Sequence, residues 1–279
     1  MNLQYDNILV SSFKEWMQHR LLNDAQAYKN VSGSLYFTQD REFRNNQVFT
    51  APFHQWVYDS SVSGANIPSG IYVNNTFIAR GTSGLAINYD YGKAILPSST
   101  FNNNASVTAS YAYKDFNIYV TTKSDKQLLI ESKFLERPIL KTATTGINTY
   151  SIVAPCIFIR NQMTSNSPFS FGGTDLTTNK IIATVFSRNE GYSYAINSFF
   201  RDSNNLNFSI LSNTPLNYYR DLKSGNYWNY TDQIDNNNIA TVEDVDSFLI
   251  DNDKISEHQP GVFVSSIEFT IKKPRIFRN

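Results

Sequence analysis

The stretch 70–120 constrains the fold of this chain more than any other segment. It contains two short hairpins, and two longer segments follow in which polar and apolar residues alternate. Asn74 and Asn75 stand at the first turn, and asparagine tolerates the positive φ that a two-residue primed turn requires. Tyr91-Gly92 turns the chain in the second hairpin. Because the alternation in 106–113 places apolar residues at every second position, we predict an antiparallel meander with one buried face.

An amphipathic helix is predicted over about residues 6–23. Apolar residues recur there at spacings of three and four, which is the period of a helix face. The apolar stripe comprises Tyr5, Ile8, Leu9, Phe13, Trp16, Met17, Leu21 and Leu22. We expect this stripe to pack on the chain's own sheet, and the alternative is burial against a neighbouring subunit.

Residues 24–69 are polar and irregular, which predicts a long contact loop or an extended arm. Apolar or β-branched runs predict further strands. Helical spacing, or a cap at Thr241, predicts two further helices, and polar segments predict loops. The predicted strands are 127–131, 150–159, 180–186, 206–211 and 261–271. The predicted helices are 190–202 and 241–249, and the predicted loops are 142–149, 161–178 and 217–231.

This element order predicts a mainly β fold. We expect an antiparallel sandwich or jelly-roll-like fold with an N-terminal amphipathic helix and short inserted helices. Residues 1–30 would form the helix and a linker, and residues 31–279 a β-rich domain with long contact loops, the two making one structural unit.

Charge and composition argue against several partners. The chain has 24 basic and 24 acidic residues and a formal net charge of +0, which argues against bulk electrostatic binding of nucleic acid, so no specific nucleic acid is expected. The apolar runs are too short to span a membrane, and the first residues lack the pattern of a secretory signal. The single cysteine, Cys156, has apolar neighbours, which predicts a buried thiol and no intrachain disulfide.

The chemistry-bearing residues do not form a recognisable motif. The histidines are His19, His54 and His258, and none has metal-ligand spacing to another or to Cys156. We expect His54 to be a hydrogen-bonded loop histidine. The acidic segments 235–238 and 251–253 resemble parts of calcium loops but lack the glycine and the terminal glutamate. We therefore predict no catalytic residue, no metal, no cofactor and no enzyme activity, although a carboxylate pair that meets only in space is an alternative.

Five segments resemble structural proteins of tailed bacteriophage particles, of the neck or head–tail junction type. They are 5–13, 21–28, 70–78, 87–95 and 109–119, and the shared pattern is a short hairpin followed by Asp-Tyr-Gly-x-Ala/Val-Ile, here 90–95. The resemblance implies a disulfide-free virion component that is made in the host cytoplasm. It also implies a homo-oligomeric ring and contacts with other virion proteins, and it transfers no catalytic residue.

Aromatic residues in two loop regions are the candidate subunit contacts, because interfaces are enriched in aromatic side chains. They are Tyr28, Tyr36, Phe37, Trp56, Tyr58, Tyr218, Tyr219, Tyr227, Trp228 and Tyr230. An alternative function is a tail-fibre or baseplate module that contacts host glycan. A lesser alternative is a virion-associated polysaccharide hydrolase.

Overall fold

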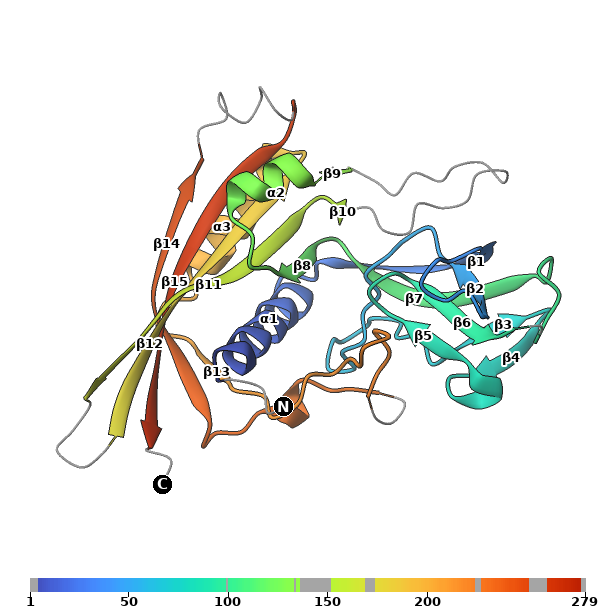
Figure 1. Cartoon of the computed structure of the whole chain (residues 1–279), viewed down its shortest axis with the longest axis horizontal. Coiled ribbons are helices and arrows are strands. Elements are labelled where there is room, and N and C mark those ends of the chain that lie inside the picture. Colours follow the sequence, from blue (N-terminus) through green and yellow to red (C-terminus); the bar gives the residue numbers. More distant parts are fainter. Residues whose placement is uncertain are drawn as a thin grey trace.

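The chain folds into two curled β-sheets with a helix at its start and short helices between strands, a β-sandwich-like arrangement (Figure 1). Strands account for 44% of the residues and helices for 19%, which confirms the predicted mainly β fold class. The computed structural model describes residues 5–98, 100–132, 134–135, 152–168, 174–223, 227–250 and 260–276.

The elements divide between the two sheets as follows. The helices are α1 (Tyr5–Asn23), α2 (Asp125–Glu131) and α3 (Glu190–Arg201), with 3-10 turns η1 (Thr82–Gly84) and η2 (Thr231–Gln233). The first sheet has the order β4-β3-β7-β1-β2-β6-β5 and contains β1 (Tyr28–Thr38), β2 (Asn46–Thr50), β3 (Gly70–Val73), β4 (Thr76–Ala79), β5 (Ala86–Asn88), β6 (Lys93–Pro97) and β7 (Val107–Lys114). The second has the order β13-β14-β15-β12-β11-β8 and contains β8 (Asn117–Val120), β11 (Cys156–Pro168), β12 (Thr174–Ser187), β13 (Asn207–Ser209), β14 (Ile239–Leu249) and β15 (Phe263–Ile276). β9 (Phe134–Leu135) and β10 (Ile152–Val153) form a separate parallel pair.

Both predicted hairpins are present in the first sheet. Asn74 and Asn75 have φ values of 47° and 66° and connect β3 to β4, as a primed two-residue turn requires. Gly92 has φ 59° in the turn before β6, and a Cβ there would lie 2.5 Å from the Phe53 carbonyl oxygen. A larger residue at position 92 would therefore meet both backbone strain and a clash.

The helix α1 packs on the second sheet of its own chain, as the sequence predicts. Leu9, Phe13 and Met17 are fully buried, and the Phe13 ring lies 4.9 Å from the ring of Phe269 in β15. The same core contains residues of α3, so α1 and α3 cover one face of this sheet. A smaller cluster around Leu128 of α2 covers the opposite face.

The predicted strand 127–131 is wrong, because these residues form the helix α2. Ser124 caps the helix. Its hydroxyl oxygen accepts a hydrogen bond from the backbone N–H of Gln127, and Gln127 Oε1 accepts one from the backbone N–H of Ser124. This capping box satisfies amides that the first helical turn leaves free. Of the apolar residues Leu128, Leu129 and Ile130, only Leu128 is buried. A short helix can bury this one side chain, so the apolar run does not require a strand.

The predicted helix 241–249 is also wrong, because these residues belong to the strand β14. The pairing of β14 with β15 shifts register between Val242 and Asp244, so Glu243 is the extra residue of a β-bulge. The bulge brings Val242 and Val245, three positions apart, to buried positions. This spacing imitates helical periodicity.

The polar segments predicted to be irregular contain long strands. Residues 24–69 include β1 and β2, with β1 paired to β7 on one side and β2 on the other. The predicted loop 161–178 contains the paired ends of β11 and β12. The strand β15 runs on to Ile276, beyond the predicted end at 271. The predicted loop 142–149 lies outside the described residues, whereas the helix predicted at 190–202 is confirmed as α3.

The order of elements places α1 between the two sheets (Figure 1). The chain passes from α1 into the first sheet at β1 and returns to the second sheet where β7 leads into β8, with only residues 115–116 between them. The helix therefore shares a core with strands that lie far from it in sequence. Among the helices in the described part of the chain, none combines the length and hydrophobicity that a membrane span requires.

Candidate functional site

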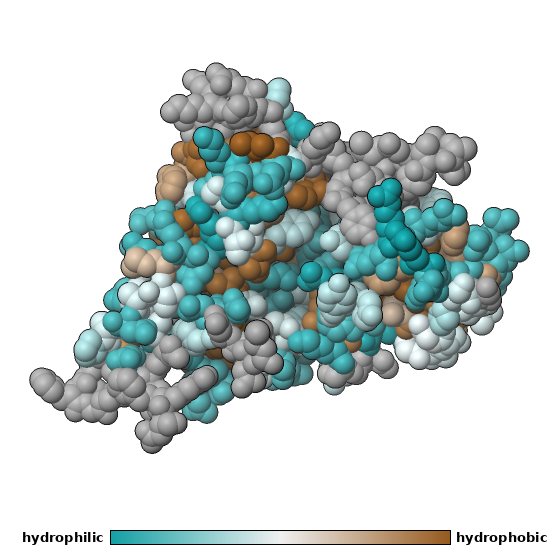
Figure 2. Space-filling view, viewed as in Figure 1, coloured by the Kyte–Doolittle hydropathy of each residue, from teal (hydrophilic) through white to brown (hydrophobic). Residues whose placement is uncertain are grey.

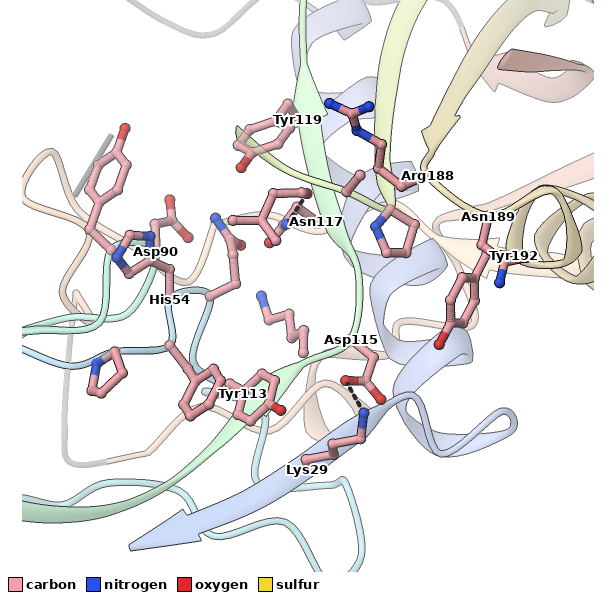
Figure 3. A pocket seen from close by; sticks show the side chains of 18 residues that line it. Lys29, His54, Asp90, Tyr113, Asp115, Asn117, Tyr119, Arg188, Asn189 and Tyr192 are labelled. Carbon is pink, nitrogen blue, oxygen red and sulfur yellow. Dashed lines mark hydrogen bonds and ion pairs between the residues drawn. The ribbon is translucent and has the colours of Figure 1, made fainter. Parts of the chain in front are cut away.

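A cavity of about 640 Å³ lies between the two sheets (Figure 3). Its walls come from the loop 52–55 and the turn 90–91 on one side, and from the turn 153–155 and the start of α3 on the other. The end of β7, the link to β8 and the start of β8, within residues 113–119, form the wall that joins the two sides. This volume lies within the range of about 300–1,000 Å³ that is usual for small-ligand sites.

The charged residues at the rim of the cavity are already paired. Lys29 lies 3.0 Å from the Asp115 carboxylate, and the dashed line in Figure 3 marks this ion pair. Asp90 lies 3.6 Å from Arg220, and Arg188 donates to the Pro260 carbonyl at 2.9 Å. The rim therefore presents both signs of charge with partners in place.

A buried polar network connects the cavity wall to α1. Lys114 Nζ donates to Gln18 Oε1 at 2.8 Å and lies 4.6 Å from the centroid of the Tyr58 ring. Tyr58 Oη in turn donates to Glu15 Oε2 at 2.8 Å. Burial lowers the pKa of Lys114 to about 8, because the charged amine loses its hydration. These bonds fix α1 against the first sheet below the cavity.

His54 also lines the cavity, and the prediction of a fully hydrogen-bonded histidine is wrong for one of its nitrogens. The residue is buried, and its Nε2 has no hydrogen-bond partner among the described residues. Burial, aided by the charge of Lys93, lowers the pKa of His54 to about 4, so the ring is neutral at pH 7.

A second histidine stabilises the region between the sheets. His19 Nδ1 lies 2.9 Å from Asp59 Oδ2, and its ring stacks on Tyr230 at 4.4 Å. Burial alone would raise the pKa of Asp59, but hydrogen bonds from His19, Ser61 and Tyr230 outweigh burial and hold it below its ordinary value. The Asp59 side chain therefore joins α1 to the segments around residues 60 and 230.

The predicted subunit-contact residues separate into buried and exposed groups. Trp56, Tyr58 and Tyr230 are buried in the chain's own cores, where they pack against residues of the same chain. Three others, Tyr28, Phe37 and Trp228, are partly buried against those cores. The remaining four are exposed: Tyr36 (50%), Tyr218 (82%), Tyr219 (55%) and Tyr227 (66%).

The outer strand β11 continues at the far end of the second sheet as an exposed segment. In β11 every residue of 162–168 is exposed, although the strand stays paired with β12 along this length. Side chains bond across the pair, from Thr177 Oγ1 to Asn166 Oδ1 at 2.8 Å and from Asn179 Nδ2 to Thr164 Oγ1 at 2.8 Å. We call residues 162–168 the sheet end, and Figure 2 shows this region mostly in hydrophilic or neutral colours.

The sheet end also has an open edge. The neighbouring strand β8 pairs only with residues 156–159 of β11, so within the described chain the outer edge of 162–168 has no neighbouring strand. The opposite edge strand, β13, pairs with β14 only at residues 239–241. Open edges present backbone amides and carbonyls that another strand can bond.

The other chemistry-bearing residues do not form a cluster. In the ranges that the structure describes, no three His, Cys, Asp or Glu side chains lie close enough to hold a metal ion. Cys156 is free and fully buried as predicted, and burial raises the pKa of its thiol. The acidic segment 251–253 lies outside the described residues.

Comparison with known proteins found no family model and no curated protein that matches this sequence.

Proposed function

We propose that this protein is a non-enzymatic structural subunit of a tailed bacteriophage particle, repeated around a ring at the head–tail junction. The observation that carries the proposal is the sheet end, where β11 stays paired with β12 although every residue of 162–168 is exposed. The resemblance of five sequence segments to neck and tail proteins supports a role in a phage particle and a place at its head–tail junction.

The sheet end suits a contact with another subunit. Residues 162–168 contain no charged side chain, so a neighbour can cover them without burying an unpaired charge. The open edge of β11 offers backbone groups to an added strand, and the polar side chains offer further hydrogen bonds. Interfaces of this kind do not depend on net charge, which agrees with the formal net charge of +0.

A ring requires two different surfaces on each subunit, because head-to-tail contacts join unlike patches. The exposed aromatic residues supply a candidate for the second surface. Tyr218 and Tyr219 lie together, with ring centroids 5.5 Å apart, and Tyr219 also lies 6.1 Å from Phe43. Exposed tyrosines are typical of subunit interfaces.

Sedimentation velocity of purified protein tests the proposal. We expect the chain to form a closed oligomer, and we expect Ser165→Lys/Ser167→Lys to dissociate it, because lysines on an edge strand oppose strand addition. The matched control is Thr76→Lys/Asn104→Lys, which adds the same charge at two exposed positions, one in β4 and one in the loop before β7. A chain that stays monomeric at high concentration and is absent from the particle would contradict the proposal.

A further inference from the structure

We propose that the cavity between the two sheets binds a short, uncharged saccharide. The inference does not rest on the structural role proposed above, because it concerns the cavity and not the sheet end. It rests on the hydrogen-bonding groups, the charge balance and the aromatic surface of the walls.

Hydrogen-bonding groups line the cavity on several sides. The Asp90 and Asp115 carboxylates, the Asn117 amide and the Tyr192 hydroxyl all belong to its lining (Figure 3). A carboxylate has about four lone-pair sites, so Asp115 retains acceptor capacity beside its ion pair with Lys29. The Asn117 Nδ2 donates to the Val153 carbonyl at 2.7 Å, which fixes the orientation of this amide. Adjacent hydroxyl groups of a sugar match such a set of acceptors and donors.

The charge balance of the walls favours a ligand without charge. An anion would approach Asp90 and Asp115, and a cation would approach the basic side chains of Lys29, Lys114 and Arg188. Each carboxylate is already neutralised by its own ion-pair partner, Asp115 by Lys29 at 3.0 Å and Asp90 by Arg220 at 3.6 Å. Uncharged hydroxyl groups can add to these residues without replacing their partners.

Aromatic rings give the cavity flat surfaces on both sides. Phe53 and Tyr113 stack almost parallel, with centroids 4.4 Å apart and an interplanar angle of 5°. Tyr192, on α3 beside the second sheet, is 53% exposed and lines the same cavity. The negative face of an aromatic ring attracts polarised C–H groups, and the faces of a pyranose ring carry such groups.

Ligand-observed NMR with the full chain tests this inference. The probes are the methyl glycosides of glucose, galactose, mannose and N-acetylglucosamine, and the disaccharides maltose and lactose. We expect at least one probe to bind, and we expect Tyr192→Ala to weaken it about three- to tenfold through the lost ring contact. Asp115→Asn should also weaken binding. Tyr194→Ala is the matched control, because Tyr194 is on the same helix and 50% exposed but does not line the cavity.

Three outcomes would overturn the inference. The first is that no probe binds at the limit of its solubility. The second is binding that Tyr192→Ala and Asp115→Asn leave unchanged, which would place the sugar elsewhere on the chain. The third is binding of inorganic phosphate or spermidine in the cavity while all the sugars fail, which would show that the site selects charge.

Discussion

Truncating Trp16 to alanine tests whether α1 is part of the chain's own core. The indole is 4% exposed and lies among aromatic rings of its own helix and of two other elements. Its centroid is 5.3 Å from that of Phe13, 5.5 Å from Phe208 in β13 and 6.3 Å from Phe200 in α3. The Arg20 guanidinium lies 5.7 Å from the ring centroid. Trp16→Ala would therefore leave a cavity bounded by helices and strands that cannot easily close it.

The expected loss follows from this burial. Replacing a buried tryptophan by alanine costs about 3–5 kcal/mol, because transfer energy is lost and a cavity remains. For a chain of this length each kcal/mol lowers the melting temperature by about 2 °C. The variant should therefore melt about 6–10 °C below the wild type, provided that the chain unfolds as one unit.

Thermal melting followed by circular dichroism measures this loss at a concentration where the wild type is monomeric. The control is Tyr218→Ala, which truncates an aromatic side chain that is 82% exposed and should change the free energy of unfolding by less than about 0.5 kcal/mol. A Trp16→Ala monomer with the melting temperature of the wild type would refute the assignment of α1 to the core. Loss of oligomers alone would instead place the apolar stripe at a subunit interface.

Three further predictions concern other buried or strained residues. The Lys93 amine is fully buried and lies 2.5 Å from the Asp40 carboxylate. Asp40→Ala removes this carboxylate and should lower the free energy of unfolding by about 3–5 kcal/mol in denaturant titrations. A loss below about 1 kcal/mol would contradict this prediction. The pKa of His54 is about 4 in the folded chain against 6.5 ordinarily, so the unfolded chain binds more protons between these values, and up to about 3 kcal/mol of stability should be lost as the pH falls through this window. His54→Gln should flatten that part of the pH dependence relative to the wild type, and an unchanged slope would count against it. Asn75→Val should cost about 1–2 kcal/mol at the φ of 66°, measured by urea unfolding, and no loss would show that the turn adopts another conformation.

The sequence predicts those elements whose signals are local. The helix α1 follows from the spacing of Leu9, Phe13 and Trp16, and the first hairpin follows from Asn74-Asn75. Each of these signals acts within a few residues, so no knowledge of the partner strands is needed.

Other elements depend on pairing that the sequence does not display. The bulge at Glu243 breaks the alternation of β14 and produces an apparent helical spacing. The end of β11, residues 162–168, is exposed and mostly polar, so no apolar period marks it as a strand. In both cases the hydrogen-bonded neighbour, and not local propensity, decides the structure.

The candidate site could be predicted only in part. The exposed tyrosines Tyr218 and Tyr219 come from a loop that the sequence indicates, but Trp56 and Tyr58 come from a similar loop and are fully buried. The cavity was not predicted because its walls come from segments between residues 29 and 192 that meet only in the folded chain. The orphaned nitrogen of His54 likewise depends on neighbours that spacing does not show.

Immunogold labelling of purified phage particles tests the proposed structural role most directly. An antibody against the exposed segment 102–104, which belongs to neither proposed interface, would be used on intact and on tail-stripped particles. Our account predicts gold particles at the head–tail junction in both preparations. The account would be contradicted if neither preparation carried label and mass spectrometry did not detect the chain in the particles. Label confined to the distal tail would instead indicate a module that contacts the host.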